Sequence, residues 1–215
     1  MISYQNEVLV FFGDSLSSLE SIQAAYPKLR IKKIRQTHSD LVIEASDSVL
    51  EADAHFTSEK NSALLIATAD CMPIMVYCRQ TRRVAAIHAG WRGIANRITE
   101  KTLQKLIATG SSKKTFQIWV GPHILQNSFE IDQAAYDLLL GAQTGLTENE
   151  FAYRLNSKYH VALKKILESQ IENVAPGTTK LLFLDIDTKT NSDYYSYRRD
   201  QKTKERNLSF ICLLN

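Results

Sequence analysis

The sequence predicts an α+β (mixed α/β) fold in which a mixed β-sheet core is flanked by helices. Two observations predict it: short apolar runs of strand length alternate with amphipathic stretches, and several consecutive strands are separated only by turns. Hairpin connections of this kind fit a purely parallel, doubly wound sheet poorly. The 215 residues contain no repeat, low-complexity tract or Pro/Gly/Ser-rich linker, so we expect one domain over residues 1–215.

Strands are expected where apolar residues run continuously over a short stretch. The expected ranges are 7–12, 30–35, 41–44, 63–67, 72–78, 84–88, 116–120, 181–184 and 208–213. Helices are expected where apolar residues recur every three or four positions, at 16–26, 94–108, 132–140 and 159–169. Pro27 and Gly110 supply C-terminal signals for the first two helices.

The composition, 44% hydrophobic and 23% charged, is typical of a soluble globular protein. The net charge of +3 comes from scattered basic residues, and the two small clusters at 79–83 and 198–206 are too short to predict a nucleic-acid surface. No apolar run reaches the length of a membrane span. Three cysteines without a CxxC motif indicate a reducing compartment, so we expect a cytoplasmic protein without membrane or nucleic-acid partners.

The stretch TADCMPIMVYCRQTRRVAAIHAGWRG carries a cysteine and a histidine at the two feet of one predicted hairpin. Counting back from the turn places Ile74 opposite His88. We expect Pro73 and Gly90 to end the ladder there, so that the chain curls and brings Cys71 and His88 to one small ligand. Either residue alone is more often explained by core packing.

His38 lies at a break between two short predicted strands, from which a loop can present it to the same edge. With Cys71 and His88 it makes a three-ligand set that suits zinc and leaves a fourth position for water or substrate. Such a site lowers the pKa of bound water to about 7. Asp70 is a candidate for orienting a ligand or acting as general base. The residues alone leave open a metal-free hydrolase with Cys71 as nucleophile and His88 as its base.

Two further stretches can bind a substrate. In Gly90-Trp91-Arg92-Gly93, backbone N–H groups and Arg92 can hold an anion, or the run is a tight turn with Trp91 in the core. In YYSYRRD, Arg198 and Arg199 suit a phosphate and a flat base, or they form salt bridges on an edge strand. The other histidines are expected to be structural or solvated: His55 and His123 near loops and His160 on a helix.

Taken in order, QTHSD, ADAHFT, TADCMPIMVY, VAAIHAGWRG, VGPHI with FEI, and YYSYRRD resemble the YfiH-like family, long labelled a multicopper polyphenol oxidase or laccase domain. The resemblance spans residues 34–200 and implies an α/β/β/α domain with a zinc site. The implied activities are phosphorolysis of adenosine, inosine and methylthioadenosine, and deamination of adenosine, with purine nucleosides and phosphate as small-molecule partners. Copper chemistry is disfavoured because it needs several centres and the chain has five histidines.

The resemblance implies that His38, Cys71 and His88 are the zinc ligands and that Arg199 lies at the substrate pocket. Together with the residue patterns above, it gives Asp70, Cys71 and His88 as the expected catalytic residues and Gln36, Arg92, Arg198 and Arg199 as the expected substrate-binding residues. The chain departs from the family pattern in three respects: FFGDSLSS near the N-terminus, residues 127–130, and the two pairs 187–188 and 205–206 on either side of the arginine motif. These departures leave the expected ligands intact and affect the expected phosphate and base contacts. The alternatives are a metal-free hydrolase on Cys71 and His88, and a non-catalytic member that retains the fold.

Overall fold

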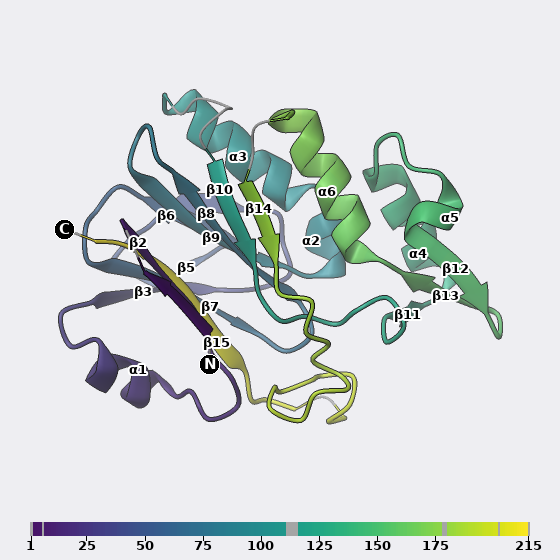
Figure 1. Ribbon diagram of the computed structural model, residues 1–215, viewed down its shortest axis with the longest axis horizontal. Coiled ribbons are helices and arrows are strands. Elements are labelled where there is room, and N and C mark those ends of the chain that lie inside the picture. Colours follow the sequence, from purple (N-terminus) through teal and green to yellow (C-terminus); the bar gives the residue numbers. More distant parts are fainter. Residues whose placement is uncertain (1, 6, 111–115, 178–179, 202, 215) are drawn as a thin grey trace.

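Two six-stranded mixed sheets pack face to face, and helices cover both outer faces in the computed structural model (Figure 1). The structure describes residues 2–5, 7–110, 116–177, 180–201 and 203–214. The α/β/β/α layering and the mixed sheet core are as predicted. Among the described residues, no helix combines the length and apolar character needed to cross a membrane.

The first sheet has the strand order β1-β2-β15-β7-β3-β5. Its strands are β1 (Ile2–Gln5), β2 (Val8–Phe12), β15 (Asn207–Leu213), β7 (Ser62–Thr68), β3 (Arg30–Arg35) and β5 (Leu50–Glu51). The pairs from β1 to β7 are antiparallel, and β3 pairs in parallel with both β7 and β5. Helix α1 (Leu19–Ala25) covers the outer face, where Ile22 lies in one apolar cluster with Phe11 and Phe210.

The second sheet has the order β14-β10-β8-β9-β6-β4. Its strands are β14 (Lys180–Phe183), β10 (Phe116–Val120), β8 (Met72–Cys78), β9 (Arg83–Ala89), β6 (Ala54–Thr57) and β4 (Val42–Glu44). Its outer face packs against α2 (Trp91–Ala95), α3 (Ile98–Ala108), α4 (Gln133–Ala142) and α6 (Leu163–Val174). A small third sheet of β11 (Glu130–Ile131), β13 (Lys158–Val161) and β12 (Ala152–Leu155) lies beside α4 and α5 (Glu148–Phe151) (Figure 1).

Strand β8 shows how the sequence fills both sides of the second sheet. Met75 and Tyr77 face the first sheet and pack with residues such as Val10, whereas Ile74 and Val76 face the helices. Successive side chains of a strand point to opposite faces, so a strand between two apolar layers needs apolar residues at every position. Every residue of β8 is buried accordingly.

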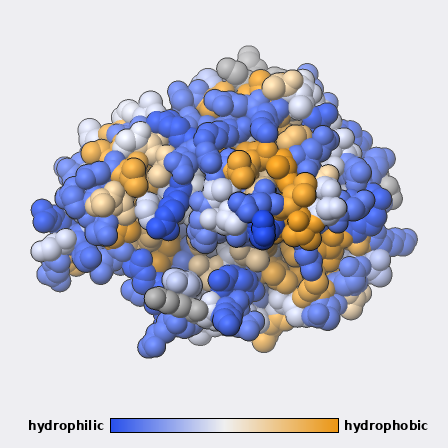
Figure 2. Space-filling model, turned by 180° about the vertical axis from the view of Figure 1, so that it is seen from behind, coloured by the Kyte–Doolittle hydropathy of each residue, from blue (hydrophilic) through white to orange (hydrophobic). Residues whose placement is uncertain are grey.

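Hydrophobic residues also reach the surface. On the face turned away from the viewer in Figure 1, hydrophobic areas lie among hydrophilic ones (Figure 2). Leu16, Val49 and Leu138 are among the exposed large side chains. Apolar atoms supply more than half of the accessible surface of ordinary globular proteins, so such exposure is unremarkable on its own.

The predicted hairpin register is wrong by one residue. Pro73, not Ile74, lies opposite His88, and pairing continues to Met72 and Ala89. The turn after β8 is one residue shorter than assumed, which shifts every pair. Proline at position 73 does not end the ladder, because the strand continues through it without needing its missing N–H.

The predicted helix over 159–169 is also wrong in its first turn. Residues Lys158–Val161 form β13, in which Tyr159 and Val161 are buried, and α6 begins only at Leu163. His160 therefore lies on a strand rather than on a helix. His55, expected near a loop, lies within β6 and is buried.

Candidate metal centre and cavity

The three expected metal ligands come together at one end of the two sheets. His38 lies in the connection from β3 to β4 and Cys71 in the connection from β7 to β8, and both connections pass from the first sheet to the second. His88 lies near the end of β9 in the second sheet. Residues that lie 17 to 50 positions apart in the chain thus meet because two crossovers and one strand end share an edge of the sandwich.

The donor atoms of His38, Cys71 and His88 all lie within 4.8 Å of one another. His38 Nε2 is 3.7 Å from Cys71 Sγ, and the two imidazole rings meet edge to face with centroids 4.8 Å apart. Tetrahedral zinc with ordinary bond lengths holds a sulfur and a nitrogen about 3.6 Å apart. The donor set and its spacing therefore fit a metal ion.

Asp53 organises the loop that presents His38. Its fully buried carboxylate accepts hydrogen bonds from three successive backbone N–H groups, those of Thr37 (3.1 Å), His38 (3.1 Å) and Ser39 (2.6 Å). Three consecutive N–H groups converge on one acceptor only if the backbone leaves the ordinary helical and extended regions. His38 accordingly has φ of 59°, in the left-handed region.

Asp53 also orients His88. The carboxylate lies 2.7 Å from His88 Nδ1, which leaves Nε2 as the nitrogen available to a metal. Burial by itself raises the pKa of Asp53, but hydrogen bonds from His88, Ser39 and Thr37 lower it to about 2. Sequence reasoning missed Asp53, and the one available signal was a carboxylate between two alanines in ADAHFT, an unusual residue for a buried strand end.

Cys71 and His88 form a charged pair. Burial raises the pKa of the Cys71 thiol, but the neighbouring His88 and His38 outweigh it and lower the pKa to about 6. Burial lowers the pKa of His88, and the charge of Cys71 with the hydrogen bond to Asp53 raises it to about 9. The metal-free pair is therefore thiolate and imidazolium near neutral pH, and the thiolate is the form of cysteine that binds metals.

Gly90 lies directly against two of the ligands. A Cβ atom on this residue would lie 2.9 Å from His38 Cδ2 and 3.1 Å from Cys71 Sγ. Its φ of −70° and ψ of 168° are accessible to any residue, so glycine is required here for space rather than for backbone freedom. His38 and Cys71 can approach each other only because this position has no side chain.

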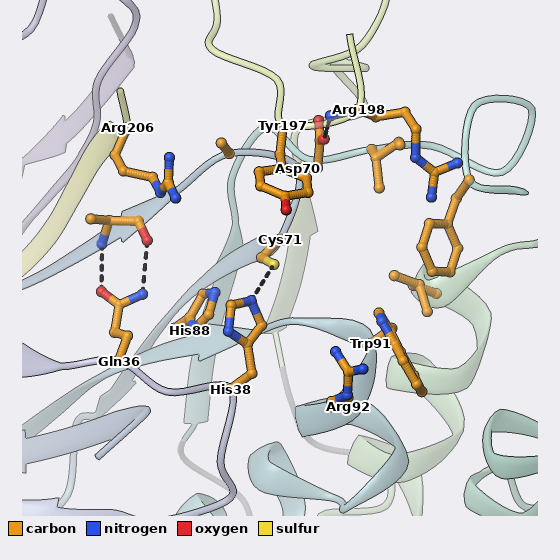
Figure 3. Close-up of a pocket in the computed structure, with 15 residues that line it drawn as sticks. Gln36, His38, Asp70, Cys71, His88, Trp91, Arg92, Tyr197, Arg198 and Arg206 are labelled. Carbon is orange, nitrogen blue, oxygen red and sulfur yellow. Dashed lines mark hydrogen bonds between the residues drawn. The ribbon is translucent and has the colours of Figure 1, made fainter. Parts of the chain in front are cut away.

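A cavity of about 420 Å³ opens onto the cluster, a size usual for small-molecule sites (Figure 3). One wall is apolar and aromatic, formed by Trp91, Ile124, Phe129 and Leu163. Three arginines also line the cavity: Arg92, Arg198 and Arg206. Asp70 is the one carboxylate among these lining residues.

Asp70 ties neighbouring segments to the cluster. Its Oδ1 accepts a hydrogen bond from Thr188 Oγ1 at 2.7 Å, and its Oδ2 accepts one from the backbone N–H of Arg198 at 2.7 Å. Both carboxylate oxygens therefore have partners, although the residue lines the cavity next to Cys71. In this structure Asp70 holds the C-terminal loop onto the turn that carries Cys71.

Three of the four expected substrate-binding residues line the cavity: Gln36, Arg92 and Arg198. The amide of Gln36 pairs with both backbone groups of Ala67, each at 2.8 Å, so it joins two segments beside the cluster. The guanidinium of Arg92 stacks 4.4 Å above the Trp91 ring, and that of Arg198 donates to the backbone oxygen of Glu130 at 3.0 Å.

Arg199 is the expected substrate-binding residue that the structure does not bring to the cavity. Its guanidinium donates to the backbone oxygens of Thr188 (2.8 Å), Asn191 (3.1 Å) and Tyr194 (2.7 Å), and it forms an ion pair with Asp200. Adjacent residues in this turn project in different directions, so Arg198 faces the cavity and Arg199 holds the loop together. In this structure Arg199 therefore holds the loop that carries Arg198, and its role in substrate binding stays a prediction.

Sequence reasoning missed Tyr197 and Arg206 as cavity residues. Their signals were weak: Tyr197 is one of three tyrosines in YYSYRRD, and Arg206 ends the basic cluster at 198–206. All five histidines and all three cysteines of the chain lie among the described residues, and they provide one His–Cys–His group within metal-binding distance.

Two packed mixed sheets with a candidate His–Cys–His metal site at their crossover end define the class of this protein. Two solved structures share the fold: the YfiH protein of Bacillus licheniformis (TM-score 0.87, 21% identity, 97% of this chain and 93% of that chain) and a DUF152 protein of Neisseria meningitidis (TM-score 0.86, 22% identity, 100% and 99%). The model of a family described as multi-copper polyphenol oxidoreductase laccase matches residues 18–214. The chain belongs to this YfiH-like family.

Curated relatives carry a different name from the family model. A purine nucleoside phosphorylase of Clostridium acetobutylicum is 30% identical over 186 residues, covering 83% of this chain and 75% of the relative. A purine nucleoside phosphorylase of Pseudomonas aeruginosa is 32% identical over 171 residues, covering 78% and 68%.

Proposed function

We propose that this chain is a zinc-dependent purine nucleoside phosphorylase that acts on adenosine, inosine and methylthioadenosine and also deaminates adenosine. The observation that carries the proposal is the His–Cys–His group facing a cavity of about 420 Å³ with an apolar wall and three arginines. The names of the curated relatives support the phosphorylase activity. Zinc and the deaminase activity rest on the donor set and on the family resemblance.

His38, Cys71 and His88 would hold the zinc ion. When bound there, zinc supplies a Lewis acid and lowers the pKa of a bound water toward neutrality. The chain itself fixes the ligands: Asp53 holds His88 by its Nδ1 and shapes the His38 loop, and Gly90 makes room for their close approach. The site is accessible from the side of His38, which is exposed, whereas His88 is buried.

The remaining lining residues suit a purine nucleoside and an anion. Trp91 and Phe129 offer flat faces against which a purine can stack, and Ile124 and Leu163 complete the apolar wall. No acidic side chain that lines the cavity pairs with Arg92, Arg198 or Arg206, so the cavity carries positive charge that suits an anionic co-substrate.

Both reactions replace one bond at the nucleoside. In phosphorolysis a phosphate oxygen bonds to ribose C1′, the bond from C1′ to the base breaks, and the base departs with a proton as ribose 1-phosphate forms. In deamination a water oxygen bonds to C6 of adenine, and the amino group departs as ammonia, leaving inosine. One cavity can serve both reactions if phosphate and water take the same place beside the cluster.

The proposal is tested by measuring ribose 1-phosphate and ammonia from adenosine, together with metal content, on protein purified without added metal. We expect one zinc per chain and both products. The His88→Ala variant should lose both activities by more than about 100-fold, in line with the loss of a metal ligand. The His160→Gln variant, which alters a histidine outside the cavity, should keep both. Unchanged rates in His88→Ala would exclude the proposed mechanism.

One observation favours a second candidate. In space, His88 lies between Cys71 and Asp53, which is the arrangement of a nucleophile, its base and an orienting carboxylate, and Cys71 is held as a thiolate. A metal-free cysteine hydrolase would contain no zinc and would lose hydrolytic activity on alkylation of Cys71. A chain that binds zinc but turns over no nucleoside would instead be a non-catalytic member of the family.

A further inference from the structure

Tyr197 lies over the His–Cys–His group, between two residues that are themselves anchored. Its hydroxyl points toward Cys71 in the cavity (Figure 3), and no described residue is hydrogen-bonded to it. The neighbouring Ser196 is fully buried, and the N–H of Arg198 is bound to Asp70. A tyrosine with 46% exposure between two anchored residues is held in the cavity by its backbone and not by packing of its ring.

Arg206 faces the same space from the other side (Figure 3). Its Nη1 donates to the backbone oxygens of Thr203 and Glu205, each at 2.7 Å. These two bonds fix the guanidinium plane, and Nε and Nη2 make no hydrogen bond with any other described residue. An arginine oriented by backbone carbonyls, with one edge of its fork unused, is arranged to bind an oxyanion.

Asn207 joins the two residues into one unit. Its side-chain amide pairs with the N–H and the C=O of Tyr195, each at 2.9 Å, and so closes the loop that carries Tyr197 and Arg206. Asn207 is itself buried at the start of β15. The loop that carries Tyr197 and Arg206 is therefore anchored to the first sheet at the start of β15.

The other two cavity arginines belong to the apolar wall. Arg92 stacks on Trp91, and the Arg198 guanidinium lies 5.9 Å from the Phe129 ring centre and donates to a backbone oxygen. Their positive charge lies where the proposed purine would stack. Arg206 lies on the side of Gln36 and His88, away from that wall (Figure 3).

We propose that Arg206 and Tyr197 form the subsite for inorganic phosphate, between the His–Cys–His cluster and the C-terminal loop. The proposal rests on the proposed phosphorylase function and names the place of its anionic co-substrate. Arg206 binds two phosphate oxygens through Nε and Nη2, and the Tyr197 hydroxyl donates to a third. The nucleoside then lies between this subsite and the Trp91 wall, with its ribose toward Arg206.

The test compares phosphorolysis and deamination of adenosine in the zinc-loaded protein, because water needs no anion site. We expect Arg206→Gln and Tyr197→Phe to raise the KM for phosphate by about 10- to 100-fold, the effect of one or two charge-assisted hydrogen bonds. Deamination by Arg206→Gln should change by less than about 3-fold, since its nucleophile comes from water and not from phosphate. Arg92→Gln should raise the KM for adenosine and leave that for phosphate unchanged.

Tyr153→Phe is the matched control, because Tyr153 is similarly exposed (38%) but bonds to Asn127 outside the cavity. Circular dichroism and zinc content verify that each variant is folded, and Arg206→Lys, which keeps the charge but not the fork, replaces Arg206→Gln if that variant is not. A rise in phosphate KM in Arg92→Gln, with none in Arg206→Gln, would overturn the assignment.

Calorimetric titration with inorganic phosphate separates this proposal from the proposed function. If the wild-type protein binds phosphate and Arg206→Gln does not, the subsite stands even when no ribose 1-phosphate is formed, and only the activity is refuted. If both bind phosphate equally, or neither binds it, the subsite is refuted whatever the activity.

Discussion

Substituting Gly90 by alanine tests whether the ligands of the proposed zinc site are held at a fixed separation. The new Cβ would lie 2.9 Å from His38 Cδ2 and 3.1 Å from Cys71 Sγ, where ordinary contacts begin at 3.4 Å. The imidazole must therefore shift by about 0.5 Å and the sulfur by about 0.3 Å. Metal–ligand distances vary by only about 0.2 Å, so both ligands would leave the bonding range unless the backbone moves.

We expect Gly90→Ala to lower zinc affinity by about 10- to 100-fold, which corresponds to about 1.4–2.8 kcal/mol. The fold should survive, because the φ and ψ of Gly90 are allowed for alanine and overpacking costs about 1–3 kcal/mol. The assay is competition for zinc with a chromophoric chelator, with urea unfolding of the metal-free protein as a measure of stability.

Gly141→Ala is the control for this substitution. Gly141 lies in α4, and a Cβ there would meet no atom within 4 Å. The Gly141→Ala substitution should leave zinc affinity unchanged and raise the free energy of unfolding by about 0.5–1 kcal/mol, because alanine has a higher helix propensity than glycine. Wild-type zinc affinity in Gly90→Ala would show that the ligands are free to rearrange, and the argument from their close approach would be wrong.

Three further predictions follow from the charges of the site and the core. Asp53→Asn should lower zinc affinity by about 10- to 100-fold through loss of the carboxylate that orients His88, and equal affinity by chelator competition would contradict that role. In metal-free protein Cys71 should react with iodoacetamide with half-maximal rate near pH 6, and zinc should protect it, as read by mass spectrometry against the two buried cysteines. Burial lowers the pKa of His55 to about 3, against about 6.5 unfolded, so its contribution to stability is complete above pH 6.5 and is lost as the pH falls toward 3. As the pH is lowered from 6 to 4, the free energy of unfolding should fall less steeply in His55→Leu than in the wild-type protein, and the two slopes should differ by about 1.4 kcal/mol per pH unit. Parallel slopes would refute this.

The fold was predictable where burial imposes a pattern on a whole element. Strands such as β7 and β8 are covered on both faces, so their sequences are nearly continuous runs of apolar residues. The elements that were not predicted are short or polar, among them β5 (Leu50–Glu51) and β11 (Glu130–Ile131). Two residues are too few to show a period, and pairing with a distant strand, not local sequence, makes them strands.

The meeting of His38, Cys71 and His88 at one place was predictable from sequence, and the residue that supports them was not. His38, Cys71 and His88 stand in distinctive motifs, whereas Asp53 acts from 15 residues beyond His38 in the chain and 35 before His88. The two neighbouring arginines show the same limit: sequence shows that Arg198 and Arg199 are adjacent but not which of them faces the cavity. That choice is made by the carbonyl groups that surround Arg199.

Three chain connections between the sheets meet at the cavity: β3 to β4 with His38, β7 to β8 with Cys71, and β14 to β15 with Tyr197 and Arg206. An ion on the proposed ligands would therefore cross-link the two layers of the sandwich at the point where their chains exchange. Its binding free energy would then add to the free energy of unfolding, and the two layers would unfold together, since they could separate only after the ion is released. Metal loss would act on this protein as a loosening of one sheet from the other, beginning at the substrate cavity.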